Sequence, residues 1–265
     1  MKKTYLREYA RLLVKCGVAI KKGDPVIINC GLDQPEFIKM LVEECYRAKA
    51  SRVIVDWSYM PLTKVHVNNR SAKELGKMED FEVAKLQYRL DKNPAMLHIV
   101  SDDPDGLRGI NQKKYGQMMK DRMKIVKPFR DRMDNKYKWC IAAVPGDAWA
   151  KKVFPGERTS VAKEKLWSAI LQASRVIDKN GNLLDAVVEW YKHNASFERR
   201  CKILNGAGLV ELKYKAKNGT DLRVGLIENT VFMGGGENTL GGEYYNPNIP
   251  TEEVFISPMA GKAEG

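Results

Sequence analysis

The pattern of apolar and polar positions divides the first two-thirds of the chain into alternating helix and strand signals. Apolar side chains recur every three or four residues from Tyr5 to Ile20, which predicts a helix with one buried face. The β-branched run Pro25–Cys30 follows a Lys-Lys-Gly-Asp stop signal and predicts a short strand buried on both faces. The alternation continues with helices over Pro35–Lys49, Ser71–Leu90, Asn111–Met133, Thr159–Asn180 and Asn182–Asn205, and with buried strands over Arg52–Trp57, Ala95–Ser101 and Trp139–Pro145.

Strands that alternate with helices of this length are typical of parallel strands joined by crossover helices. We therefore predict an α/β domain over residues 1–205, with a mostly parallel sheet flanked by helices. Near Asn205 the pattern changes to the alternation of an antiparallel hairpin, Val210–Ala216 and Asp221–Ile227, joined across Asn218-Gly219. With a last strand over Glu253–Ser257, residues 206–265 are predicted to be the incomplete first strands of an antiparallel β (α+β) domain.

Composition narrows the class of protein. With 44% hydrophobic and 29% charged residues the chain is a folded protein, and no apolar run approaches the roughly 20 residues of a membrane span. No apolar segment follows Met1-Lys2-Lys3, so we expect neither secretion nor a membrane. The five cysteines form no C-x-x-C pair, which favours a reducing cytoplasm. The chain has only three histidines, so its cysteines and histidines together predict no self-contained His/Cys metal site.

The net charge of +12 is concentrated in residues 108–138. This segment holds eleven Lys or Arg against three Asp. Such a basic helix leaves open an alternative function, a nucleic-acid-binding α/β module. The segment has few interleaved aromatic residues and no RRM, KH or helix-turn-helix signature, so a solvated helix face is the preferred interpretation and nucleic acid is not the expected partner.

Two adjacent carboxylates, Glu252 and Glu253, follow a proline-bracketed turn in Asn246–Phe255 (NPNIPTEEVF). Neighbouring side chains on a strand point to opposite faces, so only one of the two can face a given pocket. A loop followed by an exposed edge strand is the simpler alternative. The glycines of Gly234–Gly236 precede no helix start and no Lys-Ser/Thr, so we interpret them as a turn rather than a phosphate cradle.

The stretch Asn246–Phe255 resembles the N-P-N-[IM]-P-T-E-E-V-F signature of the M29 family of metallo-aminopeptidases. Gly219–Leu226 (GTDLRVGL) is similar to the hairpin of that family, and the resemblance extends to Ser101–Pro104 (SDDP), Ala142–Val153 and Val42–Ala50. It covers essentially the whole chain in order.

The resemblance implies a cytoplasmic, homodimeric exopeptidase that removes N-terminal residues from peptides with two divalent metal ions, zinc or cobalt. A glutamate of the T-E-E motif is the first metal ligand in the family. Here that residue is Glu252 or Glu253, and the resemblance does not distinguish them. It assigns no other catalytic residue in this chain, and no substrate-binding residue.

The other ligands of the family, a Glu, two His, an Asp and a nearby Tyr, lie in the last third of a full-length member. His66, His98 and His193 match none of them and are interpreted as structural or surface residues. We therefore expect the chain to be the amino-terminal two-thirds of such an enzyme, to bind no metal stably by itself and to lack peptidase activity. A scaffold that only dimerises is the remaining alternative.

Overall fold

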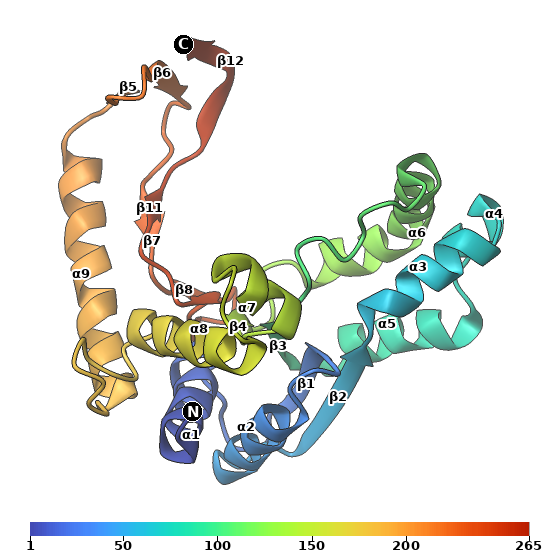
Figure 1. Ribbon diagram of the computed structural model, residues 1–265. Coiled ribbons are helices and arrows are strands. Elements are labelled where there is room, and N and C mark those ends of the chain that lie inside the picture. Colours follow the sequence, from blue (N-terminus) through green and yellow to red (C-terminus); the bar gives the residue numbers. More distant parts are fainter. Residues whose placement is uncertain (265) are drawn as a thin grey trace.

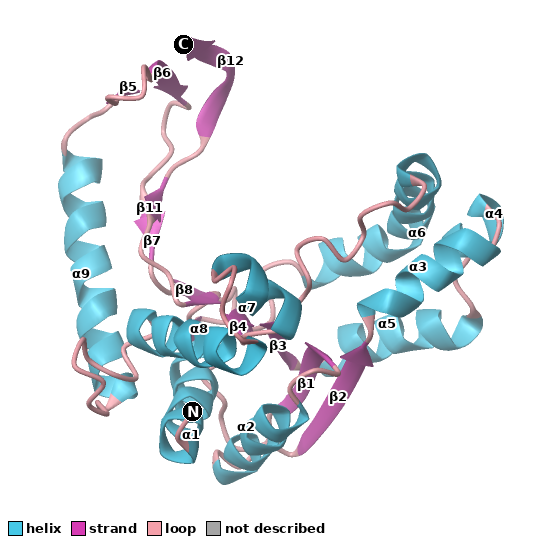
Figure 2. Cartoon of the chain, viewed as in Figure 1, coloured by secondary structure: helices cyan, strands magenta, loops and turns pink. Residues whose placement is uncertain are grey.

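The structure, a computed structural model that describes residues 1–264, has the predicted α/β architecture (Figures 1 and 2). Its helices are α1 (Lys3–Leu12), a π-helical turn (Leu13–Gly17), α2 (Pro35–Arg47), α3 (Met60–Asn69), α4 (Ala72–Gly76), α5 (Asp80–Lys92), α6 (Gln112–Met133), α7 (Asp147–Val153), α8 (Thr159–Ala173) and α9 (Ala186–Gly206). Its strands are β1 (Pro25–Gly31), β2 (Arg52–Ser58), β3 (Ala95–Val100), β4 (Trp139–Ala143), β5 (Glu211–Lys215), β6 (Asp221–Leu226), β7 (Met233–Gly234), β8 (Glu237–Asn238), β9 (Tyr244–Tyr245), β10 (Asn248–Ile249), β11 (Val254–Phe255) and β12 (Pro258–Glu264).

The central sheet has five parallel strands in the order β10-β4-β3-β1-β2. The predicted strands over 25–30, 95–101 and 139–145 are confirmed as β1, β3 and β4. The strand over Arg52–Trp57 is also present, but the prediction that it is buried was wrong. It forms an edge of the sheet, with Trp57 45% exposed, because only β1 pairs with it. At the other end the added strand is β10, from the NPNIP segment.

One face of the sheet carries the main hydrophobic core. The side chains that alternate toward this face, such as Ile28, Leu97 and Ala142, are at most 1% exposed and pack against Tyr9 of α1 and Trp167 of α8. Burial of large aliphatic and aromatic side chains stabilises a fold by about 1.5–3 kcal/mol each. This face therefore supplies most of the stability of the domain.

The opposite face is covered over only part of its length. Ile27 of β1 and Met96 of β3 pack against Met133 at the end of α6 in a smaller core. From there α3, α4, α5 and α6 extend to one side, away from α1, α2 and α8 (Figure 1). These helices have a small core of their own around Val67, Leu75 and Ile110.

The prediction of a single helix over Ser71–Leu90 was wrong, because the structure divides this segment into α4 and α5. Ser71 is the predicted cap, accepting a hydrogen bond from the Glu74 amide, but α4 ends at Gly76. A Cβ on Gly76 would lie 2.8 Å from the Cβ of Asp121, so this glycine allows α4 to approach α6 closely. A second capping box at Glu79 then begins α5. Helices α3 and α7 were not predicted.

Helices α8 and α9 are both shorter than predicted. The prediction carried α8 to Asn180, whereas it ends at Ala173, because Asp178 organises a turn by accepting the backbone amides of Asn180 and Asn182. Helix α9 begins later than predicted, at Ala186, where the Asp185 carboxylate accepts the amide of Val188 as an N-cap.

The hairpin predicted across Asn218-Gly219 is confirmed as β5 and β6, with Gly219 at a φ of 96°. Strand β12 pairs antiparallel with β6 and was not predicted. The strand predicted over Glu253–Ser257 is reduced to β11, which pairs with β7. The division of the chain at residue 205 stays a prediction, and β10 shows that part of the later segment belongs to the parallel sheet.

A buried lysine connects three parts of the fold. Lys138 is 5% exposed, and its Nζ lies 2.6 Å from Oδ2 of Asp24 and 3.4 Å from Oε1 of Glu243. It also donates to the carbonyl of Ala19 at 3.2 Å. The lysine thus joins the loop before β1 to the segment before β9, because a buried ammonium must keep its charged and hydrogen-bonding partners.

Replacing this lysine should destabilise the protein. We expect Lys138→Met to lower the free energy of unfolding by about 3 kcal/mol, because it leaves two carboxylates without their buried cation. Urea denaturation measures the change. Lys136→Met is the matched control, since Lys136 is exposed and forms no ion pair within residues 1–264, and it should change stability by less than about 0.5 kcal/mol. Equal effects of both substitutions would contradict the role of Lys138.

The same cluster predicts a pH dependence. The hydrogen bond from Lys21, with the charge of Lys138, lowers the pKa of Glu243. A lowered folded-state pKa contributes stability that is fully present above the unfolded value, about 4.3, and is lost as the pH falls through the folded value. The stability lost in Glu243→Gln relative to the native chain should therefore be largest near pH 6 and shrink toward pH 3. Glu228→Gln, at an exposed position, should show no such trend in urea titrations.

Candidate functional site

A buried stripe on α9 holds the start of the NPNIPTEE segment. Trp190, His193, Asn194 and Phe197 follow helical spacing and are at most 6% exposed. The Trp190 Nε1–H donates to Oδ1 of Asn246 at 3.1 Å, and Nδ2 of Asn246 donates to the Cys16 carbonyl at 3.0 Å. The asparagine is therefore fixed between α9 and the end of the π-helical turn.

His193 holds the next part of the segment. Its Nε2 lies 2.8 Å from the Thr251 carbonyl oxygen, and its ring packs edge-on against Trp190 and Phe197. Burial lowers the pKa of His193, so the neutral ring donates Nε2–H to Thr251. Sequence reasoning treated this histidine as structural. In the structure this role is to hold the Thr251 carbonyl. The helical spacing of the buried stripe was the sequence signal that could have predicted a buried position for His193.

The Glu252 carboxylate is engaged by a guanidinium. Its Oε1 lies 2.9 Å from Nη1 of Arg175, which follows α8, and its Oε2 lies 3.8 Å from Nε2 of His193. The Glu252 side chain is 60% exposed. Because an arginine already neutralises it, this carboxylate is poorly placed to bind a cation.

The neighbouring Glu253 faces different surroundings. It lines a cavity of about 140 Å³ together with Trp139, Met233, Gly234, Gly235, Gly236, Glu237, Pro247, Asn248, Thr251 and Phe255. Residues 251–253 are irregular rather than part of a strand, and Glu252 pairs with Arg175 whereas Glu253 lines the cavity.

The same cavity contains a second carboxylate that sequence reasoning missed. Glu237 lies on β8 opposite Tyr245 of β9, and its Oε1 accepts a hydrogen bond from the Tyr245 hydroxyl. Burial, followed by the hydrogen bond to Glu237, raises the pKa of Tyr245 far above its usual range, so the phenol remains a donor. A single acid in a glycine-rich stretch carries no sequence signal, because only the pairing of β8 with β9 brings it to the cavity.

The triple glycine allows close packing beside Glu253, and the structure confirms that it connects two short strands. Gly235 has a φ of 79°. A Cβ on Gly236 would lie 2.3 Å from Cζ of Tyr244, and one on Gly234 would lie 2.9 Å from the Glu253 carbonyl oxygen. Next to Gly235, the buried amide of Asn194 has no hydrogen-bond partner within residues 1–264.

The described residues do not fit a two-metal centre. Among residues 1–261, whose side chains the structure describes, no group of three or more His, Cys, Asp or Glu could hold a metal ion. Glu253 and Glu237 share a cavity, but catalytic zinc sites use three protein ligands for each ion. His66 lies exposed on α3 and His98 lies on β3, so neither completes the set. We therefore derive no reaction step through a metal.

Four of the five cysteines are poorly suited to act as nucleophiles. Cys16, Cys30, Cys45 and Cys140 are buried, as predicted, and burial raises the pKa of Cys16 to about 12. A thiol with such a pKa carries almost no thiolate near neutral pH.

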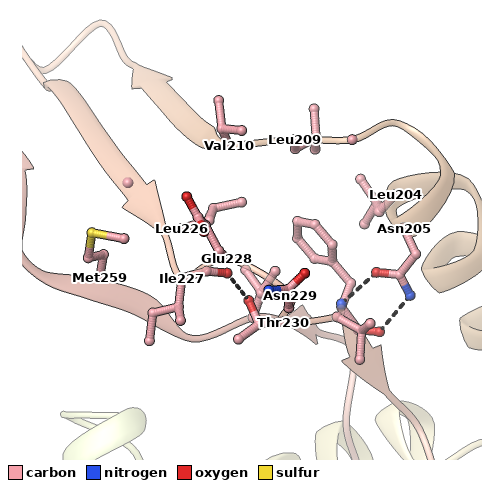
Figure 3. Close-up of a pocket in the computed structure, with 15 residues that line it drawn as sticks. Leu204, Asn205, Leu209, Val210, Leu226, Ile227, Glu228, Asn229, Thr230 and Met259 are labelled. Carbon is pink, nitrogen blue, oxygen red and sulfur yellow. Dashed lines mark hydrogen bonds between the residues drawn. The ribbon is translucent and has the colours of Figure 1, made fainter.

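A larger cavity of about 600 Å³ lies away from Glu253, between the end of α9 and the β5–β6 hairpin (Figure 3). Its lining combines apolar side chains, including Leu209, Leu226 and Met259, with the polar residues Asn205, Glu228, Asn229 and Thr230. At this cavity the Asn205 side chain holds the backbone of Phe232, accepting a hydrogen bond from its amide at 2.7 Å and donating one to its carbonyl at 3.2 Å. Its lining offers no cluster of titratable groups, so we place the candidate site at Glu253.

None of the helices in residues 1–264 has the length and apolarity that a membrane crossing requires.

The five-stranded parallel sheet flanked by helices places the chain among the α/β proteins. Residues 2–265 match the model of the thermophilic metalloprotease (M29) family, and the chain belongs to that family. It is 33% identical to aminopeptidase PepS of Streptococcus thermophilus and 30% identical to aminopeptidase T of Thermus thermophilus, in each case over 99% of the chain. The solved structure of wild-type AmpT from Thermus thermophilus matches with a TM-score of 0.87 at 29% identity, over 99% of the chain. The chain spans 63% of the length of each of these relatives.

The glycine contacts at the site generate a stability prediction. Gly236→Ala should destabilise the protein by about 1–3 kcal/mol, because its methyl group would overlap Tyr244 and the Tyr245 carbonyl. Gly116→Ala on α6 is the control. A Cβ there meets nothing within 4 Å, and alanine should stabilise the helix by about 0.5–1 kcal/mol. Urea unfolding measures the change in the free energy of unfolding of each variant. A Gly236→Ala variant as stable as the native protein would contradict the close packing of Gly236 against Tyr244.

Proposed function

We propose that this chain forms the α/β part of a metal-dependent aminopeptidase and supplies one carboxylate ligand, Glu253. Membership of the M29 family and the similarity to proteins named aminopeptidases support the reaction class. The observation that carries the residue assignment is the separation of the two glutamates. Glu253 lines a cavity beside Glu237, whereas Glu252 is paired with Arg175.

The cofactor of the complete enzyme is a pair of divalent ions, zinc or cobalt, which supply an activated water and polarise the scissile carbonyl when bound. This chain's own residues prepare one side of the site. His193 and Arg175 hold the Thr251–Glu252 part of the loop, so that Glu253 is presented to the cavity.

The proposed substrates are peptides with a free amino terminus, and the proposed assembly is a cytoplasmic homodimer. Glu237 and Glu253 give the cavity the negative charge that favours a peptide ammonium group.

The competing function, nucleic-acid binding by residues 108–138, has weaker support. Much of this segment is α6, where Arg122 pairs with Glu82, and Lys124 and Lys127 pair with acids on the same helix. Three of the eleven cations, all on α6, are therefore paired with acids within the fold.

Activity measurements test the proposal in two forms of the protein. Residues 1–265 with Zn²⁺ or Co²⁺ should not hydrolyse leucine p-nitroanilide detectably, because the described residues lack a ligand set. The chain joined to the segment that follows the matched region in a relative should be active. In that protein Glu253→Gln should lower kcat/KM by about 100-fold or more, through loss of a ligand.

Glu252→Gln is the matched control and should retain activity within about tenfold, because Glu252 does not line the cavity and Gln can still accept a hydrogen bond from Arg175. Larger loss in Glu252→Gln than in Glu253→Gln would reverse the assignment. Hydrolysis by residues 1–265 alone would contradict the conclusion that the ligand set is incomplete.

A further inference from the structure

Glu237 is a carboxylate that the fold holds in a fixed position at the candidate site. It lies on β8 directly opposite Tyr245 of β9, and its Oε1 accepts a hydrogen bond from the Tyr245 hydroxyl. Tyr245 is 1% exposed, and the centroid of its ring lies 6.4 Å from that of Trp139 on β4. A donor packed in this way has little freedom to move, so it fixes the orientation of the Glu237 carboxylate at the wall of the cavity.

The hydrogen bond from Tyr245 uses only part of this carboxylate. An ionised carboxylate has two oxygens that together accept about four hydrogen bonds, and Tyr245 donates one of them. Among the side chains that the structure describes, no Lys, Arg or His forms an ion pair with Glu237. Because a neutral amide oxygen could also accept the bond from Tyr245, the negative charge of Glu237 is available for a ligand.

The cavity that Glu237 lines is negatively charged and has no cation of its own. Glu253 is its second carboxylate, and its lining within the described part of the chain contains no Lys, Arg or His. Two carboxylates in one small cavity repel each other, and a positive group bound close to both relieves this repulsion. The cavity therefore favours a ligand with a positive charge.

The apolar part of the lining indicates what kind of cation fits. Met233 of β7 lies opposite Phe255 of β11, and the two residues are 44% and 56% exposed. With Trp139 they give the cavity an apolar wall in addition to its carboxylates. An ammonium group attached to a carbon chain contacts both kinds of wall, whereas two carboxylates are fewer than the three protein ligands of a catalytic zinc site.

The volume of the cavity, about 140 Å³, limits the size of the bound group. This is room for roughly four or five water molecules at about 30 Å³ each. An amino-terminal ammonium group with the first carbons of its residue is of this size. The rest of a peptide would lie outside the cavity, so the cavity is suited to recognise the terminus rather than the whole peptide.

We propose that Glu237, oriented by Tyr245, binds the amino-terminal ammonium group of the peptide substrate. The inference rests on the proposed function, because it takes the ligand to be the substrate of the site that contains Glu253. It goes further by naming the residue that distinguishes a free amino terminus from a blocked one. An acylated terminus carries no charge and would leave the Glu237 carboxylate without a partner, which is how a polar site rejects a ligand that lacks the expected donor.

Metal-free binding to the 265-residue chain tests the inference. The probes are leucinamide, which has a free ammonium group and no carboxylate, and N-acetyl-leucinamide, which has the same side chain and no charge. They are added to ¹⁵N-labelled protein at about pH 6.5, below the usual α-amino pKa of about 8, and in about 0.15 M salt, which screens weak surface binding. Leucinamide should shift the backbone amide signals of residues 233–237 and 244–246. N-acetyl-leucinamide should bind at least about tenfold more weakly, since it loses the charge-assisted contact with Glu237.

A variant separates the charge of Glu237 from its structural contact. Glu237→Gln keeps an oxygen that accepts the hydrogen bond from Tyr245, so it preserves the packing and removes only the charge. It should weaken the binding of leucinamide at least about tenfold and leave that of N-acetyl-leucinamide unchanged. Glu228→Gln is the matched control, because Glu228 is exposed and lines the larger cavity instead, and it should leave the binding of leucinamide within about twofold.

Three results would overturn the inference. The first is equal binding of leucinamide and N-acetyl-leucinamide to the native chain. The second is a set of shifts confined to other acidic surfaces, such as the loops 31–33 and 101–103. The third is undiminished binding of leucinamide to a folded Glu237→Gln variant. If that variant does not fold, the comparison of the two probes and the location of the shifts in the native chain still decide the inference.

Turnover by the extended protein provides an independent readout. An ammonium contact is made by the bound substrate and by the transition state alike, so Glu237→Gln should raise KM for leucine p-nitroanilide about tenfold and change kcat much less. Binding of leucinamide at Glu237 with no hydrolysis by the extended protein would contradict the proposed function alone. Hydrolysis by the extended protein without a selective effect of Glu237→Gln on KM or on leucinamide binding would contradict the role of Glu237 alone.

Discussion

The rest of the site depends on the hydrogen bonds of one buried asparagine. Asn246 is 1% exposed, and its backbone amide lies 3.1 Å from the Cys16 carbonyl and 2.9 Å from that of Gly17. Its side chain accepts from Trp190 and donates to Cys16, so its polar groups satisfy carbonyls left open at the end of the π-helical turn. An apolar residue here would leave those groups buried without partners, which costs about 1–3 kcal/mol for each.

Fixing Asn246 determines where the next residues go. Two positions later β10 pairs with β4, which makes a late segment of the chain the edge strand of the amino-terminal sheet. Gly17 permits this arrangement, since a Cβ there would lie 3.0 Å from Sγ of Cys140 on β4. The candidate site is thus attached to the most buried part of the fold, and its geometry follows from core packing.

The two faces of the sheet have different roles. The face against α1, α2 and α8 is a conventional core, in which each aliphatic side chain contributes through burial. The other face is packed only where α6 ends, and its remaining rows are polar or partly exposed. This second face therefore buries fewer aliphatic side chains than the first and contributes less to the stability of the domain.

The sequence by itself determined the alternation of helices and strands and the hairpin at Asn218-Gly219. These follow from local periodicity and turn chemistry, which depend on neighbouring residues in the chain. It could not determine that the helix after Ser71 breaks at Gly76, that β2 is an edge strand, or that Glu237 lies beside Glu253. Each of these depends on contacts between separate segments. The helix breaks where Gly76 packs against Asp121, β2 is an edge because only β1 pairs with it, and Glu237 is placed by its contact with Tyr245. Tertiary structure alone also decided which glutamate lines the cavity, because Glu252 is held by Arg175, in the turn after α8, and by His193 of α9, both far away in the chain.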